Sequence, residues 1–405
     1  MKRLFHLLIF VFFISAAIGQ NNKVVSAYNY HKNGKLDKAK EAIDDATVHE
    51  KTMNDAKTWF YRGNIYIDIY RSTEYKDLDA DALNKAWEAY KKAKELDDKD
   101  KYTSDINQFM PIVGESYFND GANKFNQGMT AQDANDTTAA KQAFTGSMKS
   151  FEKAYEIYNE AGINDTTTVY YISVAAELAG KYDIAKEKLL TLKEMNYDKS
   201  SIYTSLANIY YKQDNDKDKA LEVYAEGREK YPTDLNLLLN QTNLFLAEGM
   251  TDKALNNLEM AARIDTTNPT IFFAIGAKYN EVVDDTTKNE DMRKNAFNKA
   301  VNAYDKAIEL DQNYFDPNYN MGALYVNRAS ALIDIANQLP LDQQDEYDAM
   351  IEEANDYLEK SIPYLEKAHE LEPADRSTMI SLKEIYTRLK MNDKLQEINA
   401  KLESN

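Results

Sequence analysis

Apolar and polar positions alternate along the chain with the spacing of amphipathic helices, most clearly in AVNAYDKAIELDQNYFDPNYNMGALY, residues 300–325. Ala300, Tyr304 and Ala307 follow one another at spacings of four and three, which places them on one face of a helix. The Asp316–Pro317 pair then predicts a break, because aspartate is a favoured helix N-cap and proline a favoured first helical residue. The stretch therefore predicts a helix, a short turn and the start of a second helix.

The same pattern recurs along the chain. The second-helix pattern recurs in 85–97, 149–157, 219–232, 253–265 and 362–373. In 85–97, 219–232 and 253–265, as in the opening stretch, small residues lie seven positions apart with a large residue between them. In the first helix, an aromatic residue follows three positions after a small one, as in 59–66, 202–213, 271–279 and 318–325. Small residues let two helix backbones approach to roughly 8–10 Å, and the aromatic rings fill the hollows beside that contact.

This arrangement resembles the tetratricopeptide repeat, a helix-turn-helix unit of about 34 residues. The unit 200–234 carries the resemblance best, through Tyr203, Ala207, Tyr210, Ala220, Tyr224, Gly227 and Pro232. The resemblance implies an all-α fold, an α-solenoid of about nine such hairpins. The expected units start near residues 24, 56, 115, 166, 200, 235, 269, 315 and 376, and together they would form a single solenoid over 20–405.

Four units exceed the standard length, and the eighth gains the most. This unit holds the stretch 328–361, which remains apolar-periodic, so we expect a helical pair lengthened beyond the stack and broken near Pro340. Insertions of this kind emerge on one edge of a solenoid, often the functional edge.

The N-terminal residues 1–19 have the pattern of a secretory signal peptide. Lys2 and Arg3 precede an apolar run over 7–18, and small residues precede a cleavage point at Gln20. We expect export to a periplasm or release from the cell, with no membrane insertion once the signal is cleaved. The chain has no cysteine, which excludes disulfides and leaves no residue for a cysteine-linked lipid anchor.

The net charge and the absence of catalytic or metal-binding motifs narrow the possible partners and activities of the chain. The chain has 49 Lys and Arg residues against 67 Asp and Glu residues, a net charge of −18, which argues against nucleic acid as a partner. His31, His49 and His369 lie in no metal-binding motif, and no nucleophile elbow or phosphate-binding glycine loop occurs. We therefore expect no enzyme activity, no metal and no cofactor.

The triplet Asp-Thr-Thr occurs four times, at Asp136, Asp165, Asp265 and Asp285, and each lies in an expected turn. One interpretation is capping, in which the aspartate accepts backbone N–H groups. The other is that the triplet resembles a short O-glycosylation acceptor of exported bacterial proteins. The acceptors would be Thr137, Thr166, Thr266 and Thr286. The two interpretations are compatible.

In tetratricopeptide repeats the first helices line a concave groove that takes peptides or partner helices. Transferring those positions to this chain gives a candidate partner-binding groove of aromatic and asparagine residues: Phe60, Tyr61, Asn64, Asn119, Asn123, Tyr170, Tyr171, Asn208, Tyr211, Asn240, Asn243, Phe273, Tyr319 and Asn320. Asparagine amides can pair with the N–H and C=O of an extended partner. The plainer alternative is that these are ordinary exposed polar residues.

These observations predict a non-catalytic interaction or scaffold protein of a bacterial envelope, which binds a protein or peptide partner. The alternative is a glycan-handling protein that uses the aromatic groove for sugars. Asn64, Asn208 and Asn243 each follow a packing residue, and we expect them to face away from the second helix of their own unit.

Overall fold

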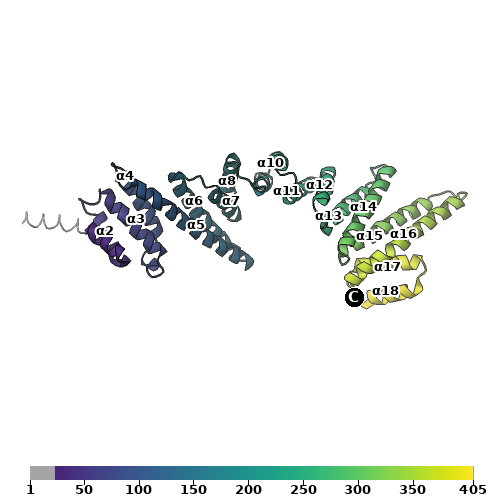
Figure 1. Cartoon of the computed structure of the whole chain (residues 1–405). Coiled ribbons are helices and arrows are strands. Elements are labelled where there is room, and N and C mark those ends of the chain that lie inside the picture. Colours follow the sequence, from purple (N-terminus) through teal and green to yellow (C-terminus); the bar gives the residue numbers. More distant parts are fainter. Residues whose placement is uncertain (1–22, 405) are drawn as a thin grey trace, which may run out of the picture. The chain divides into compact units, whose positions relative to one another are not determined.

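The computed structural model describes residues 23–404, and every regular element in that range is a helix. The expected signal peptide, 1–19, lies outside the described residues. The chain divides into two compact units, residues 1–220 and residues 221–405, and each is described by itself. Figure 1 shows the order of the helices along the chain.

The first unit is built from consecutive helical hairpins. A helix over residues 23–32 precedes the labelled elements. These are α2 (Leu36–Thr47), α3 (Ala56–Arg71), the 3₁₀ turn η1 (Lys76–Leu78), α4 (Ala82–Leu96), α5 (Thr103–Asp133), α6 (Thr137–Glu160), α7 (Thr166–Leu178), α8 (Tyr182–Glu194) and α9 (Ser201–Lys212). Helix α10 (Lys217–Lys230) contains the boundary between the two units.

The second unit continues with the same hairpin architecture. Its helices are α11 (Leu235–Ala247), α12 (Thr251–Ile264), α13 (Pro269–Asp284), α14 (Glu290–Leu310), α15 (Phe315–Ala336), α16 (Gln344–Leu371), α17 (Arg376–Arg388) and α18 (Asn392–Ser404). The all-α solenoid of tetratricopeptide-like hairpins is thus confirmed. The continuity of one solenoid through both units stays a prediction.

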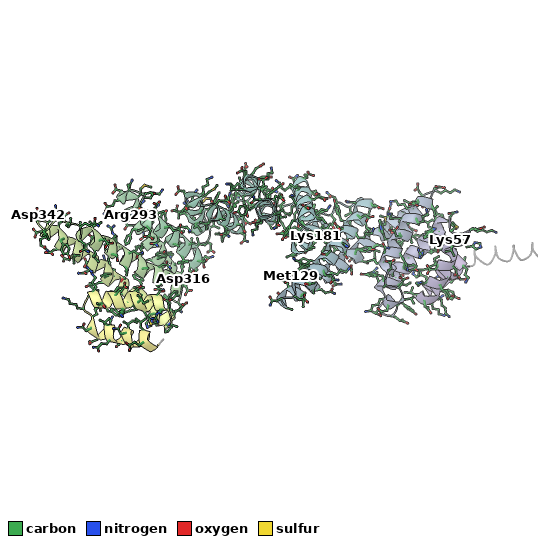
Figure 2. All side chains as sticks on the ribbon, turned by 180° about the vertical axis from the view of Figure 1, so that it is seen from behind. Lys57, Met129, Lys181, Arg293, Asp316 and Asp342 are labelled. Carbon is green, nitrogen blue, oxygen red and sulfur yellow. The ribbon has the colours of Figure 1, made fainter. Side chains whose placement is uncertain are left out.

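Lengthened helices occur where the sequence predicts them. In the eighth hairpin α15 has 22 residues and α16 has 28, and Pro340 lies in the turn between them. Asp342 marks that turn, and Met129 lies towards the end of the 31-residue α5 (Figure 2).

Helix α5 begins at Thr103, well before the expected unit start near residue 115. The reason is Asp97, whose carboxylate accepts hydrogen bonds from the backbone N–H groups of Lys101, Tyr102 and Thr103 at 2.6–3.0 Å. These N–H groups precede or open the helix and would otherwise lack partners.

One N-cap prediction is wrong. Helix α15 begins at Phe315 and its N-cap is Tyr314, so Asp316 lies inside the first turn. An acidic side chain is favourable there because of the helix dipole, and Pro317 loses no intrahelical hydrogen bond in the first turn.

The small residues permit the close packing that the sequence predicts. Gly276 of α13 lies against the buried ring of Tyr304 of α14, and a Cβ at Gly276 would come within 2.5 Å of Tyr304 Cε1. Any larger residue at this position would displace the ring.

Polar networks connect successive hairpins in the second unit. Tyr386 of α17 donates its hydroxyl to Glu366 Oε1 of α16 at 2.7 Å, and Lys394 Nζ of α18 donates to the same oxygen at 2.5 Å. In the preceding hairpins Tyr279 of α13 donates to Glu259 of α12 in the same manner, at 2.5 Å. Each network joins the second helix of one hairpin to the next hairpin.

Candidate partner-binding surface

An aromatic cluster lies at the first helices of the N-terminal hairpins. The Tyr28 and Tyr61 rings are 5.1 Å apart, and Phe60 stacks on Tyr102 at 5.1 Å. Phe60 is buried and forms the inner part of the cluster, whereas Tyr61 is half-buried and 40% of Tyr28 is exposed. Lys57 Nζ lies 5.7 Å from the Tyr61 ring.

A second cluster lies on α7 and the turn that precedes α9. The Tyr170 ring is 5.8 Å from Tyr171 and 5.6 Å from Tyr197, and Lys199 Nζ lies 4.3 Å from the Tyr170 ring centre. Tyr171 stacks on buried Phe151 and remains 37% exposed. A lysine at this distance is attracted by the face of the ring.

These contacts follow a recurrent rule. Phe60, Tyr170 and Phe273 are each the fifth residue of a first helix. Each packs against a tyrosine from the turn before the next first helix: Tyr102 at 5.1 Å, Tyr197 at 5.6 Å and Tyr314 at 5.4 Å. These turn tyrosines are not among the positions expected from the first helices. Their signal in the sequence is a tyrosine up to four residues before the next first helix.

Asn64 does not face away from its own second helix, contrary to expectation. Its Oδ1 accepts a hydrogen bond from Tyr90 Oη of α4 at 2.7 Å, and the residue is half-buried. The neighbouring Gly63 causes this, because it allows the Tyr90 ring to approach α3 closely.

Two other candidate asparagines are bound to their own helices. Asn240 Nδ2 donates to Asn236 O, and Asn320 Nδ2 donates to Asp316 O, both at 2.8 Å. Each bond uses one of the two N–H donors of the amide, which leaves one N–H and the carbonyl oxygen for other partners.

The remaining candidates lie on several first helices and differ in exposure. Asn119, Asn123 and Asn243 are exposed, whereas Asn208, Tyr211 and Tyr319 are half-buried. Asn208 lines a cavity of about 530 Å³ in the first unit. Among the aromatic candidates, the structure brings together Phe60 with Tyr61 and Tyr170 with Tyr171, both in the first unit.

The capping interpretation is confirmed for two of the four Asp-Thr-Thr triplets, and the other two form turns after a helix. Asp136 and Asp165 are N-caps of α6 and α7 and accept backbone N–H bonds. Asp265 and Asp285 instead follow the C-terminal ends of α12 and α13, where each accepts the N–H of the second threonine of its own triplet, at 3.0 and 2.9 Å. The hydroxyls of Thr267 and Thr287 also donate to the carboxylates of Asp265 and Asp285, respectively. The backbone and hydroxyl hydrogen bonds together lower the pKa of both aspartates.

The middle threonines of the triplets differ in exposure. Thr137, Thr266 and Thr286 are exposed, whereas Thr166 is half-buried. Their modification stays a prediction.

Within residues 23–404, no three His, Cys, Asp or Glu side chains are placed to hold a metal ion. None of the described helices is both long and apolar enough to cross a membrane.

Comparison with known proteins supports the tetratricopeptide family. Residues 289–327, in α14 and the first part of α15, match the family model described as TPR repeat. None of the curated proteins compared with the chain matches it. Tetratricopeptide repeat proteins generally act as protein-interaction scaffolds, and their fold is typically non-catalytic.

Several solved structures resemble this chain. The C-terminal part of a TPR repeat-containing protein from Cytophaga hutchinsonii is 18% identical, with 69% of this chain and 93% of that chain covered and a TM-score of 0.42. The MamA protein is 17% identical, covering 50% and 89%, with a TM-score of 0.37. YrrB, described as a TPR protein with an unusual peptide-binding site, is 18% identical, covering 48% and 88%, with a TM-score of 0.32.

Proposed function

We propose that the chain is an exported, non-catalytic scaffold of a bacterial envelope that binds a protein partner along its first helices. The observation that carries this proposal is the pair of partly exposed tyrosine clusters with adjacent lysines, around Tyr28 and Tyr61 and around Tyr170 and Tyr171. Tyrosine is enriched in protein interfaces because its ring buries a large apolar area while its hydroxyl keeps a hydrogen bond.

The binding test uses the mature chain, residues 20–405, on peptide and glycan arrays. Tyr28→Ala and Lys199→Gln should each weaken binding to captured peptides at least about fivefold, which corresponds to about 1 kcal/mol. Lys92→Gln is the matched control, because it removes the same charge from the second helix α4, where Lys92 pairs with Glu95.

Two results would contradict the proposal. Binding to glycans without binding to peptides would favour the glycan-handling alternative. Equal peptide affinity of the two variants and the control, with unchanged circular dichroism, would place binding away from the tyrosine clusters.

Export is proposed from the basic start and apolar run of residues 1–19. N-terminal sequencing of the protein from its native cell should begin near Gln20. Intact Met1 in the cytoplasmic fraction would contradict export.

Glycosylation of the capped turns is compatible with this function. The exposed Thr137, Thr266 and Thr286 each follow an aspartate that is already fixed by backbone N–H bonds. The intact mass of native protein should exceed the sequence mass by discrete sugar increments, and substitution of these threonines should remove them. A native mass equal to the sequence mass would leave capping as the sole role.

A further inference from the structure

A small cavity lies in the second unit where the lengthened parts of two neighbouring hairpins meet. It has a volume of about 220 Å³, and its walls come from the end of α13, the start of α14, the second half of α15 and the first half of α16. A standard 34-residue hairpin is too short to supply these walls, so the cavity depends on the extra residues of the seventh and eighth hairpins.

Three cationic side chains line this cavity: Arg293, Lys294 and Arg328. Figure 2 labels Arg293 near the start of α14. Within the described part of the chain none of the three forms a salt bridge, whereas Lys306, further along α14, pairs with Glu309 at 2.9 Å. Arg293 is close enough to Asp284 and Asp285 for its charge to act on both carboxylates, although it forms no salt bridge with either.

The charge inside the cavity is nevertheless small. Asp284 and Glu353 also line it, which leaves a net charge of +1 for the five charged side chains. Arg293 Nε donates to Val283 O at 2.8 Å, which fixes the guanidinium at the wall. A bound group with one negative charge would neutralise the cavity, whereas a dianion such as phosphate would leave it negative.

One side of the cavity is apolar. Phe297 of α14 and Tyr357 of α16 both line it, and their rings meet edge to face at 5.8 Å. Val283 and Ala331 add aliphatic surface. The lining therefore combines cationic side chains with two aromatic rings, so that a ligand with a charged end and an apolar end could contact both.

We propose that this cavity binds a monocarboxylate that carries a short aromatic or apolar remainder. The carboxylate would take the planar donor groups of Arg293 and Arg328, whose geometry suits two-point hydrogen bonding to a carboxylate. The remainder would lie against Phe297 and Tyr357. A volume of about 220 Å³ is below the usual 300–1,000 Å³ of drug-sized pockets, so the ligand is small.

The test is calorimetric titration of the mature chain with 3-phenylpropionate, 3-phenylpropanamide and inorganic phosphate. We expect saturable binding of the carboxylate, at least about tenfold weaker binding of the neutral amide, and weaker binding of phosphate. Arg328→Gln should weaken carboxylate binding at least about tenfold, which corresponds to about 1.4 kcal/mol. Lys306→Gln is the matched control, because it removes one charge from α14 outside the cavity and should leave binding unchanged.

Several results would overturn the proposal: no binding of the carboxylate, equal binding of the amide, preferential binding of phosphate, or an unchanged affinity in Arg328→Gln. Circular dichroism verifies that each variant is folded. If Arg328→Gln fails to fold, the second variant is Arg328→Lys, which keeps the charge but loses the two-point donor geometry, and weaker carboxylate binding is again expected.

Discussion

Close packing of glycine against a buried ring can be tested in the α5–α6 hairpin by Gly121→Ala. The new Cβ would lie 2.8 Å from Phe151 Cδ1 and 2.9 Å from Cε1. Carbon atoms pack optimally at about 3.5–4.0 Å, so the methyl group overlaps the ring. Phe151 is 1% exposed and has Phe118 and Tyr171 at ring-centre distances of 5.1 and 5.4 Å, which hinder its retreat.

The same hairpin provides a matched control, Gly146→Ala in α6. Its Cβ would lie 3.4 Å from the nearest atom, Cδ of the flexible Lys124 side chain. Both substitutions gain the helix propensity of alanine over glycine, about 1 kcal/mol. Only Gly121→Ala adds overpacking, which typically costs about 1–3 kcal/mol. We therefore expect Gly146→Ala to be more stable than the parent by about 1 kcal/mol, and Gly121→Ala to be less stable than Gly146→Ala by about 1–3 kcal/mol.

The measurement is urea unfolding of the mature chain and both variants, followed by far-ultraviolet circular dichroism. Hydrogen exchange at α5 and α6 localises the effect, because the stability of a repeat protein depends on each repeat and its neighbours. If Gly121→Ala proves as stable as Gly146→Ala, the glycine is not required for the approach of the two helices, and the packing argument is refuted.

Three further substitutions test single contacts. For Glu366, burial raises the pKa, but hydrogen bonds from Lys394 and Tyr386 outweigh burial and hold the pKa of this carboxyl below its usual range. Its stabilisation is therefore present above about pH 4.5 and lost as pH falls further, so Glu366→Gln should lower the urea midpoint at pH 7, with the difference shrinking below pH 4.5. Asn64→Ala should cost about 0.5–1.5 kcal/mol, because it removes the acceptor of a tyrosine hydroxyl, whereas exposed Asn243→Ala should be neutral or slightly stabilising in the same urea assay. Asp165→Ala removes the N-cap of α7 and should lower stability by about 0.5–2 kcal/mol in thermal melting, and an unchanged melt would contradict its capping role.

The hairpins could be predicted because their determinants are local. A stripe such as Ala300, Tyr304 and Ala307 depends only on spacing along one helix, and all three residues are buried in α14. The break near Pro340 is equally local. The beginning of α5 was harder to predict from the sequence. It depends on Asp97, which precedes the helix by six positions and accepts hydrogen bonds from the backbone N–H groups of Tyr102 and Thr103.

Side-chain orientation within the candidate surface could not be predicted with the same success. Asn64 and Asn243 occupy equivalent sequence positions, yet one is half-buried and bonded to Tyr90 and the other is exposed. The difference arises from the residue that precedes each. Gly63 admits a ring beside α3, whereas Thr242 directs its hydroxyl to Leu238 O of its own helix. The orientation of each asparagine thus depends on the residues of the opposite helix, and the residue spacing within one helix gives no information about them.

The cavity between the lengthened hairpins could not be predicted from the sequence, for a related reason. Arg293, Arg328 and Tyr357 lie up to 64 positions apart (357 − 293), and each alone is an ordinary residue of an amphipathic helix. Their proximity follows only from the packing of α14, α15 and α16.

The contacts of the turn tyrosines are intermediate between local patterns, which the sequence predicts, and long-range contacts, which it does not. Tyr102, Tyr197 and Tyr314 each pack on the fifth residue of the preceding first helix, so the contact is long in sequence but recurs with the repeat. Because the turn leads directly into the next hairpin, each ring fills the junction between consecutive first helices and also remains half-exposed. The same residue can then stabilise the stack and offer contact area. In such positions a substitution that weakens partner binding must be judged together with its effect on unfolding, since packing and recognition share one side chain.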